Sequence, residues 1–217
     1  MIDQMDRRTK GTLTTIALIA LIAASVLLFN HLANGYATAA TTTPRLNLQG
    51  EKVYDTPIPA PGFTLKDQNG QTISLSQFKG RPVFLIFLDS QCPHGDCELE
   101  EQQIGQAAKD LGPQASQVAW VGITVNVTDT PQTVNKSLQN NNVNIAAFHW
   151  LLGTQQQLSP VWNAYAEYVQ TDPSTGVVIH SDQSFILDKQ GKERVQWFDD
   201  YLDHSVIAAD LKTLLAA

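Results

Sequence analysis

Apolar and polar residues alternate along this chain in a pattern typical of buried strands separated by amphipathic helices. Two runs, 83–88 and 118–125, are apolar at nearly every position, as expected of strands that are buried on both faces of a sheet. Between them, apolar residues recur every three or four positions over 98–111, which predicts a helix ending at Gly112-Pro113. This order predicts two buried strands separated by a helix.

The remaining segments extend this layout. Residues 63–65 and 72–75 alternate around a turn-forming sequence, which predicts a β-hairpin. Thr130 is the predicted N-cap of a helix that begins at Pro131 and fades near residue 140. The other expected elements are a strand at 148–151, a helix from Ser159-Pro160, extended segments at 177–180, 183–187 and 195–198, and a terminal helix over 206–215. We therefore expect an α/β, thioredoxin-like fold, with a central mixed β-sheet flanked by helices and an N-terminal β-hairpin.

A long apolar segment stands near the start of the chain. It runs from Leu13 to Phe29 and follows three basic residues, a pattern that predicts one transmembrane helix with its N-terminus in the cytoplasm. We expect a cytoplasmic stub and anchor at 1–34, a linker at 35–56 and an extracytoplasmic domain at 57–217, tethered to the cell membrane. A cleaved signal peptide is the alternative, because Ala37-Thr38-Ala39 resembles a cleavage site.

The expected domain is acidic. From residue 35 onward it has 11 Lys and Arg against 19 Asp and Glu, a net charge of −8. Such a charge repels phosphate backbones, so nucleic acid is not an expected partner.

Both cysteines, Cys92 and Cys97, lie between the first buried strand and the helix that follows, with His94 between them. Cys97 is expected in or just before the first helical turn, where unpaired N–H groups favour a thiolate. Four acidic residues surround it in the sequence: Asp96, Glu98, Glu100 and Glu101. Their charges oppose the thiolate, so we do not expect a strongly activated nucleophile. The pair predicts a redox couple, a soft-metal site or a structural disulfide, which an extracytoplasmic location would preserve.

A series of short motifs makes the chain similar to a known family. In order, they are the segment 58–70, the Lys79-Gly80 turn, Cys92-Pro93, Asp129-Thr130-Pro131, 150–153 and 178–181. Together they resemble the SCO/SenC family, whose members are membrane-tethered, thioredoxin-like copper proteins of cytochrome c oxidase assembly. The similarity lies in the conjunction of the motifs, since each one alone is of low specificity.

The resemblance implies that Cys92, Cys97 and His180 bind one copper ion. The family's cysteines are spaced C-P-x-x-x-C, whereas four residues separate them here, and Gly95 is the position that would absorb the extra residue. Two thiolates and an imidazole suit Cu(I), and also Cu(II). Zinc would require a fourth ligand, for which His94 or water is available.

Two functions from different classes follow. The first is a copper metallochaperone that delivers copper to the CuA-bearing subunit of cytochrome c oxidase, or reduces the cysteines of that site, with a thiol reductant protein as a second partner. The alternative is a thiol-disulfide oxidoreductase that uses Cys92 and Cys97. That class carries C-x-x-C and a cis-proline facing it, whereas no proline follows Pro173 here. A thiol peroxidase is disfavoured, because Asp89 replaces the threonine of that class. A purely structural tethered domain is a further alternative.

Other residues receive structural interpretations. The tryptophans are expected in the core: Trp120, Trp150, Trp162 and Trp197. His31 is expected near the membrane interface and His149 in a structural or surface role, while His204 begins the last helix with no assigned partner. Asp129 is interpreted as a helix-capping residue, with a partner contact as the alternative.

Overall fold

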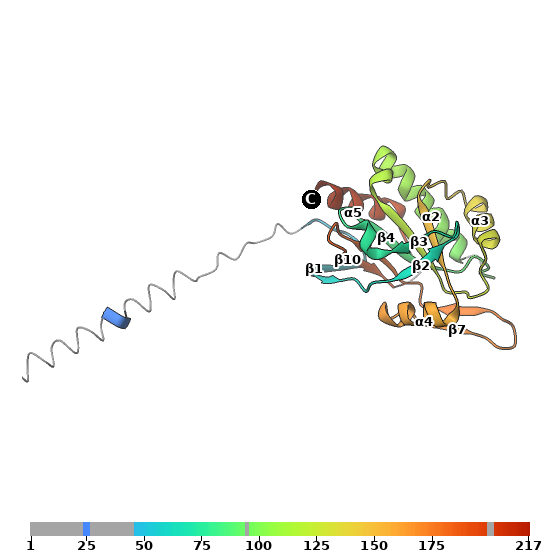
Figure 1. Ribbon diagram of the computed structural model, residues 1–217. Coiled ribbons are helices and arrows are strands. Elements are labelled where there is room, and N and C mark those ends of the chain that lie inside the picture. Colours follow the sequence, from blue (N-terminus) through green and yellow to red (C-terminus); the bar gives the residue numbers. More distant parts are fainter. Residues whose placement is uncertain (1–23, 27–45, 94–95, 199–201) are drawn as a thin grey trace, which may run out of the picture. The chain divides into compact units, whose positions relative to one another are not determined.

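The computed structural model describes residues 24–26, 46–93, 96–198 and 202–217 (Figure 1). Residues 45–217 form a compact unit built on an eight-stranded sheet. In chain order its strands are β1 (Lys52–Pro59), β2 (Thr64–Asp67), β3 (Thr72–Ser74), β4 (Val83–Leu88), β5 (Ala119–Thr124), β6 (Phe148–Leu152), β9 (Ser184–Leu187) and β10 (Lys192–Trp197). Across the sheet the order is β1-β10-β9-β4-β5-β6-β2-β3. A separate two-stranded ribbon consists of β7 (Val169–Thr171) and β8 (Val178–His180).

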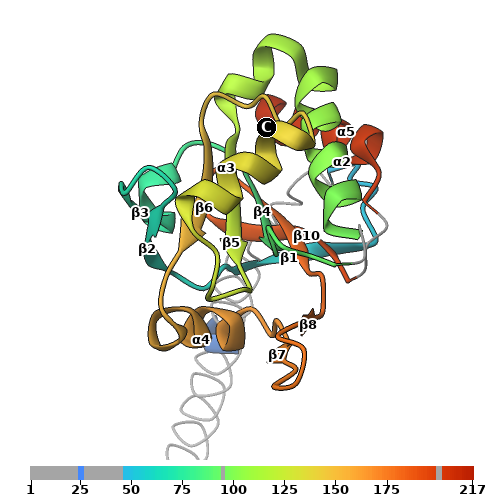
Figure 2. The ribbon, with the colours of Figure 1, turned by 90° about the vertical axis from the view of Figure 1, so that its right-hand side faces the viewer.

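Helices cover both faces of this sheet. They are α2 (Asp96–Leu111), α3 (Pro131–Asn140), α4 (Gln155–Ala164) and α5 (His204–Ala216), with short 3₁₀ turns η1 (Leu75–Phe78) and η2 (Gly112–Gln117). Helices α2, α3 and α5 lie on one face and α4 on the other (Figures 1 and 2). The predicted central mixed sheet, its flanking helices and the hairpin β2–β3 are thus confirmed.

Strand β4 explains why a continuous apolar run is required at the centre of the sheet. All six of its residues are buried. Alternate side chains enter the two cores: Phe84, Ile86 and Leu88 pack with α2, α3 and α5, while the intervening three pack with α4. The four tryptophans, at 0–4% exposure, belong to these cores, as predicted.

The pairing of β4 determines which segments meet beyond its C-terminal end. β4 runs parallel to β5 and antiparallel to β9, with Ile86 opposite Ser184. Beyond the last pair, the backbone N–H of Phe87 donates to the carbonyl of Gln183 at 3.2 Å. The residues that follow β4 and those that precede β9 therefore leave the sheet side by side, at the C-terminal end of β4.

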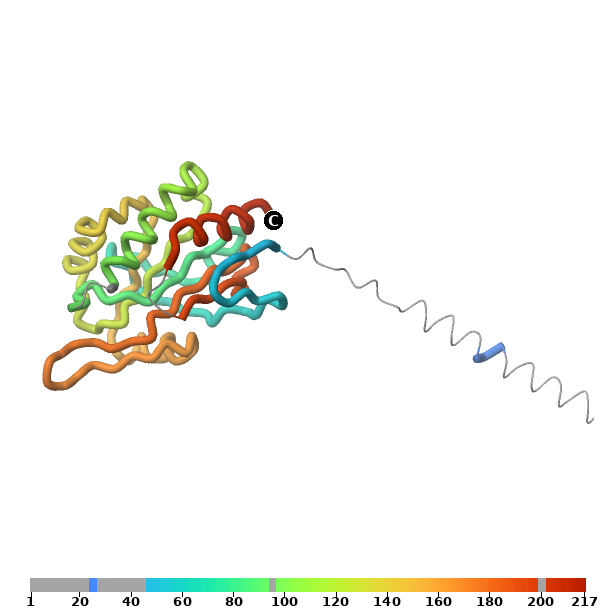
Figure 3. Tube along the Cα trace, turned by 180° about the vertical axis from the view of Figure 1, so that it is seen from behind, coloured from blue at the N-terminus to red at the C-terminus, as the bar shows by residue number. Residues whose placement is uncertain are grey.

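The compact unit begins further upstream than residue 57. Strand β1 includes residues 52–56 of the predicted linker and pairs antiparallel with β10, Val53 opposite Val195. Asp210 of α5 then accepts hydrogen bonds from the backbone N–H groups of Gln49 (2.8 Å) and Gly50 (3.0 Å), which joins the start of the unit to its last helix (Figure 3). Because β1 is an edge strand, no regular apolar–polar alternation marks it.

The predicted start of α4 at Ser159 is wrong. The helix begins at Gln155, after the N-cap Thr154, whose backbone N–H donates to Gln157 Oε1 at 3.0 Å. Pro160 consequently lies inside the helix rather than at its first turn. The capping box, and not the proline, defines this helix start.

A membrane-spanning helix is not found among the described residues, because none of their helices is both long and apolar enough to cross a bilayer. The predicted anchor at 1–34 lies outside the described part of the chain except for residues 24–26. It stays a prediction.

Candidate metal and redox site

Residues 89–93, here called the cysteine arm, carry Cys92 away from the end of β4. Cys97 is the second residue of α2 and is 3% exposed, whereas Cys92 is half-buried. Neither is part of a disulfide, and their side chains are hydrogen-bonded to each other. The structure therefore brings the two predicted thiols together and places Cys97 in the first turn of the helix, as expected.

The environment of Cys97 disfavours its thiolate. The hydrogen bond with Cys92, burial, and the negative charges of Cys92 and Glu100 raise the pKa of Cys97, and a hydrogen bond from the Asp89 backbone only partly opposes them. The thiol is consequently protonated at neutral pH. The direction agrees with the expectation that Cys97 is not a strongly activated nucleophile, and of the acidic residues named for it from the sequence Glu100 contributes.

Residues 180–183, here called the histidine arm, connect β8 to β9. His180 is the last residue of β8, and its side chain is 6% exposed. Its Nδ1 lies 2.9 Å from Asp182 Oδ1 and 3.3 Å from Glu167 Oε1. Burial lowers the pKa of His180, but the hydrogen bonds and charges of Asp182 and Glu167 outweigh burial and raise this pKa to about 10. Two carboxylates beside Nδ1 keep a proton there, so the neutral ring has its lone pair on Nε2.

Glu167 also orders the backbone of the histidine arm. Its buried carboxylate accepts hydrogen bonds from the N–H groups of Ser181 (2.9 Å) and Gln183 (3.1 Å). Sequence reasoning missed both carboxylates that orient His180. Asp182 stands two positions from His180 and offered a local signal, but Glu167 is thirteen residues away and belongs to no motif.

The cysteine arm borders a polar cleft of about 200 Å³, which the turn of the ribbon and the start of β8 also line. Asp89, Gln91 and Pro93 line one side, and residues 175–178 of the ribbon line another. Within the described part of the chain, however, no group of three or more His, Cys, Asp or Glu side chains is close enough together to hold a metal ion. Cys92 and Cys97 are thus in contact, but His180 does not join them in such a group. His94 lies outside the described residues.

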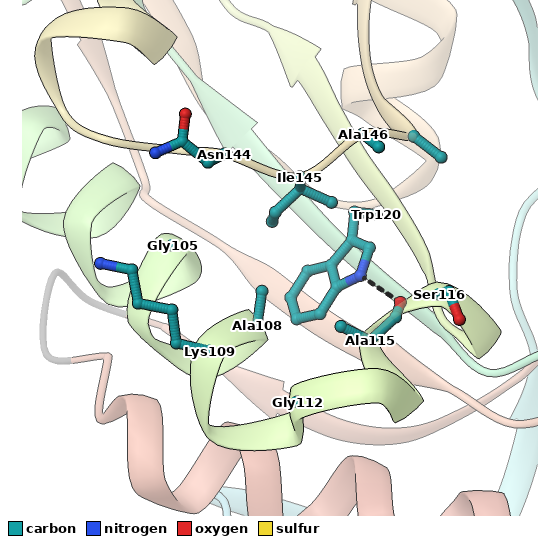
Figure 4. Close-up of a pocket in the computed structure, with 11 residues that line it drawn as sticks. Gly105, Ala108, Lys109, Gly112, Ala115, Ser116, Trp120, Asn144, Ile145 and Ala146 are labelled. Carbon is teal, nitrogen blue, oxygen red and sulfur yellow. Dashed lines mark hydrogen bonds between the residues drawn. The ribbon is translucent and has the colours of Figure 1, made fainter.

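Another cavity, of about 370 Å³, has neither cysteine among its described lining residues (Figure 4). It is lined mainly by small residues from the C-terminal half of α2, from η2 and from the segment before β6. The indole of Trp120 borders it and donates to the carbonyl of Ala115 at 3.0 Å. Lys109 is its single charged lining residue, and no thiol or imidazole lines it, so it adds no metal ligand to the site.

Asp129 does not cap α3, contrary to the interpretation from sequence. Thr130 is the N-cap, as predicted, and its Oγ1 accepts a hydrogen bond from the Thr133 N–H at 3.2 Å. The carboxylate of Asp129 instead accepts hydrogen bonds from Ser90 and Thr124. Burial raises the pKa of Asp129, and these hydrogen bonds oppose the rise.

The remaining histidines have structural partners where the chain is described. His149 Nδ1 lies 2.9 Å from Asp67 Oδ2, in agreement with a structural role. His204 Nδ1 lies 2.5 Å from Asp110 Oδ2 and thereby links the start of α5 to α2. His31 falls outside the described residues.

Known structures share this fold. Copper-bound ScoI from Bradyrhizobium japonicum matches with a TM-score of 0.63 at 24% identity, covering 72% of this chain and 99% of ScoI. BsSco, a member of the Sco family of cytochrome c oxidase assembly proteins in which a disulfide switch was identified, matches with a TM-score of 0.63 at 19% identity, covering 74% of this chain and 95% of BsSco. These similarities establish the common fold.

Sequence relatives include other thiol proteins. Peroxiredoxin Q from Populus jackii is 26% identical over 158 residues, which are 71% of this chain and 65% of the relative. The thiol-disulfide oxidoreductase ResA of Bacillus subtilis is 31% identical over 99 residues, which are 46% of this chain and 50% of ResA. The chain thus spans less than two thirds of the length of these curated relatives.

One family accounts for most of the chain. The model of the SCO1/SenC family matches residues 54–216, a range that includes every strand from β2 to β10, both cysteines and His180. The chain belongs to the SCO1/SenC family.

Proposed function

We propose that this protein binds one copper ion through Cys92, Cys97 and His180 and delivers it to the CuA-bearing subunit of cytochrome c oxidase. The observation that carries the proposal is the antiparallel pairing of β9 with β4. Because of this pairing, the histidine arm lies at the C-terminal end of β4, where the cysteine arm begins. Copper-bound relatives of the same fold and the assembly role of the Sco family support the choice of metal and recipient.

The donor groups suit a soft metal ion. Cys92 and Cys97 offer two sulfurs already in contact, and thiolate with imidazole favours copper over harder cations. Carboxylates bonded to the far nitrogen of a ligating histidine are the usual support of such a ligand, and Asp182 and Glu167 provide them for His180. Binding releases the thiol protons. Because Cys92 is half-buried, a ligand from the recipient can reach copper held there.

Binding requires a third ligand to approach the two thiols. In our proposal the ribbon β7–β8, which lies across the polar cleft from the cysteine arm, carries His180 towards them. His94 is the competing third ligand. The membrane anchor at 1–34 and an extracytoplasmic domain complete the proposal, because an oxidising compartment makes a reductant for Cys92 and Cys97 necessary before copper binds.

Titration of the reduced full-length chain with Cu(I) tests this proposal. We expect one copper per chain in the wild type, no tight binding in Cys97→Ser and weakened binding in His180→Ala. His149→Ala is the matched control, since His149 is also paired with a carboxylate through Nδ1 but belongs to another part of the sheet. A wild type that binds no copper, or a His180→Ala variant that behaves like His149→Ala, would contradict the ligand set.

Thiol-disulfide exchange is the second candidate function. It is favoured by the contact between the two thiols and by the similarity to ResA. In such a reaction Cys92 and Cys97 would become a disulfide while a substrate disulfide is reduced to two thiols. Turnover of a disulfide substrate by the copper-free wild type, with excess glutathione returning Cys92 and Cys97 to thiols, would support this activity if it is abolished in Cys92→Ser, and inertness would exclude it.

A further inference from the structure

The carboxylate of Asp129 receives several hydrogen bonds from the cysteine arm. Ser90 donates to it twice, from Oγ to Oδ1 at 2.5 Å and from the backbone N–H to Oδ2 at 3.3 Å. The side-chain amide of Gln91 also donates to Oδ1, at 3.2 Å. On its other side, Oδ2 accepts from the Thr124 hydroxyl at the end of β5, at 2.5 Å. The carboxylate therefore ties the two residues immediately before Cys92 to the neighbouring strand of the sheet.

A second carboxylate holds the same arm from within. Asp89 Oδ1 accepts hydrogen bonds from the backbone N–H of Gln91 at 2.9 Å and from the side-chain amide of Asn126 at 3.0 Å. The backbone of Asp89 is hydrogen-bonded to Cys97. The arm is thus hydrogen-bonded to three residues of the β5–α3 loop, Asn126, Thr128 and Asp129. Asp89 of the arm also contacts the partner thiol.

These contacts leave Asp129 without a role in local secondary structure. Thr130 caps α3, and the side chains that donate to Asp129 are those of Ser90, Gln91 and Thr124. Removing Asp129 would take the charged acceptor from Ser90 and Gln91, leaving Ser90 its contact with Thr133 and Gln91 its contact with Thr128, and would leave the cap of α3 intact. The network therefore acts on the position of the cysteine arm.

We propose that Asp129 is a positioning residue for the thiol pair: through Ser90 and Gln91 it holds the cysteine arm so that Cys92 faces Cys97. The inference deepens the proposed function, on which it rests for the role of the pair in copper binding. The positioning itself concerns the two thiols whether or not a metal is present. Holding the arm raises the effective concentration of one thiol at the other.

Equilibration with glutathione measures that effective concentration directly. A protein thiolate first attacks glutathione disulfide and releases one glutathione. The second protein thiolate then displaces the other, so that two protein thiols become one disulfide while glutathione disulfide becomes two glutathione thiols. The fraction of oxidised full-length chain, trapped with a thiol reagent and measured by mass spectrometry, yields the equilibrium constant.

We expect this equilibrium constant to fall about tenfold in Asp129→Ala and about fivefold in Ser90→Ala, because each loses hydrogen bonds to a charged group. Ser90→Thr keeps a hydroxyl and should restore the wild-type value within about twofold. Asp210→Asn is the matched control. Asp210 is also an aspartate that accepts two backbone hydrogen bonds, but from Gln49 and Gly50, so its replacement should leave the thiol equilibrium unchanged.

An equilibrium constant that is unchanged or increased in Ser90→Ala would overturn the inference, and so would an equal fall in Asp210→Asn. If Asp129→Ala does not fold, Ser90→Ala and its rescue by Ser90→Thr decide the matter, since they change one half-buried hydroxyl. The readout contains no copper. A failure of copper binding and a failure of positioning are therefore separate results.

Discussion

The cysteine arm and the histidine arm both leave the sheet at the C-terminal end of β4, but acidic side chains hold them in different ways. In the cysteine arm, the carboxylates of Asp89 and Asp129 accept hydrogen bonds from amides and hydroxyls. At the histidine arm, the carboxylates of Glu167 and Asp182 flank Nδ1 of His180, which carries a proton. Both networks fix a backbone through neutral donors, but only the carboxylates beside the histidine arm also pair with a side chain that can carry a positive charge.

The difference has a chemical consequence. The pKa values of Cys97 and His180 are both raised, but for opposite reasons: contact with Cys92, burial and nearby negative charge disfavour the thiolate, whereas nearby negative charge favours the imidazolium against the effect of burial. Both groups therefore hold a proton at neutral pH. A metal that binds them must displace that proton, which makes its affinity dependent on pH. Acidic residues thus contribute to the raised pKa of both groups, by disfavouring an anion at Cys97 and by favouring a cation at His180.

The largest expected effect comes from removing the carboxylate of Glu167, which holds the histidine arm. Glu167→Ala leaves the backbone N–H groups of Ser181 and Gln183 without their acceptor and removes one of the two carboxylates beside His180, so we expect a loss of about 4 kcal/mol in the free energy of unfolding. Glu167→Gln keeps an acceptor oxygen and should lose about half as much. Urea denaturation measures both. Equal stability of the two variants would show that the carboxylate does not organise this arm.

A pH-dependent effect is expected in the helix behind the cysteine arm. Glu101 of α2 is buried and accepts a hydrogen bond from Ser137 at 2.6 Å. Burial outweighs the hydrogen bonds it receives and raises the pKa of Glu101 from 4.5 to about 7. The folded state thus binds this proton more tightly than the unfolded state. The stability that this bound proton contributes to the folded state is fully present below pH 4.5 and is lost as the pH rises through 7.

This loss is up to about 3 kcal/mol for a pKa difference of that size. Urea unfolding of the wild type and Glu101→Gln between pH 4.5 and 8 measures it. We expect the stability of the wild type to fall relative to that of Glu101→Gln over this range. A constant difference between the two proteins would show that Glu101 is already ionised in the fold.

The smallest effect separates capping from positioning. Thr130→Ala removes the N-cap of α3 and should cost about 1 kcal/mol of unfolding free energy. The side chain of the adjacent Asp129 still holds Ser90, so the glutathione equilibrium of the thiol pair should not change. Measuring both quantities on one sample tests this. A change in the equilibrium as large as that of Asp129→Ala would merge the two roles.

Local patterns were sufficient to predict the centre of the fold. The apolar runs of β4 and β5, the period of α2 and the Thr130 cap are all properties of neighbouring residues, and the structure confirms each of them. Strand β1 was missed because an edge strand faces solvent irregularly. The start of α4 was misplaced because Pro160 suggested a first turn that the Thr154 capping box supplies.

The site was predictable as far as its motif and topology extend. The Cys97 position follows from the strand–loop–helix order, and the approach of the His180 segment follows from the fold. The groups that hold the ligands do not follow from local patterns. Glu167 and its partners Ser181 and Gln183 are separated in the sequence by the whole ribbon β7–β8. Asp129 was assigned to the helix it precedes, although its carboxylate contacts a residue 39 positions earlier.

In the proposed function, Cys92, Cys97 and His180 bind one copper ion together. X-ray absorption of the Cu(I)-loaded full-length chain measures this most directly, because sulfur and nitrogen neighbours of copper give distinct scattering. We predict two sulfurs and one nitrogen in the wild type and in His149→Ala, with the nitrogen lost in His180→Ala and retained in His94→Ala. A nitrogen that survives in His180→Ala, or disappears in His94→Ala, would contradict the claim.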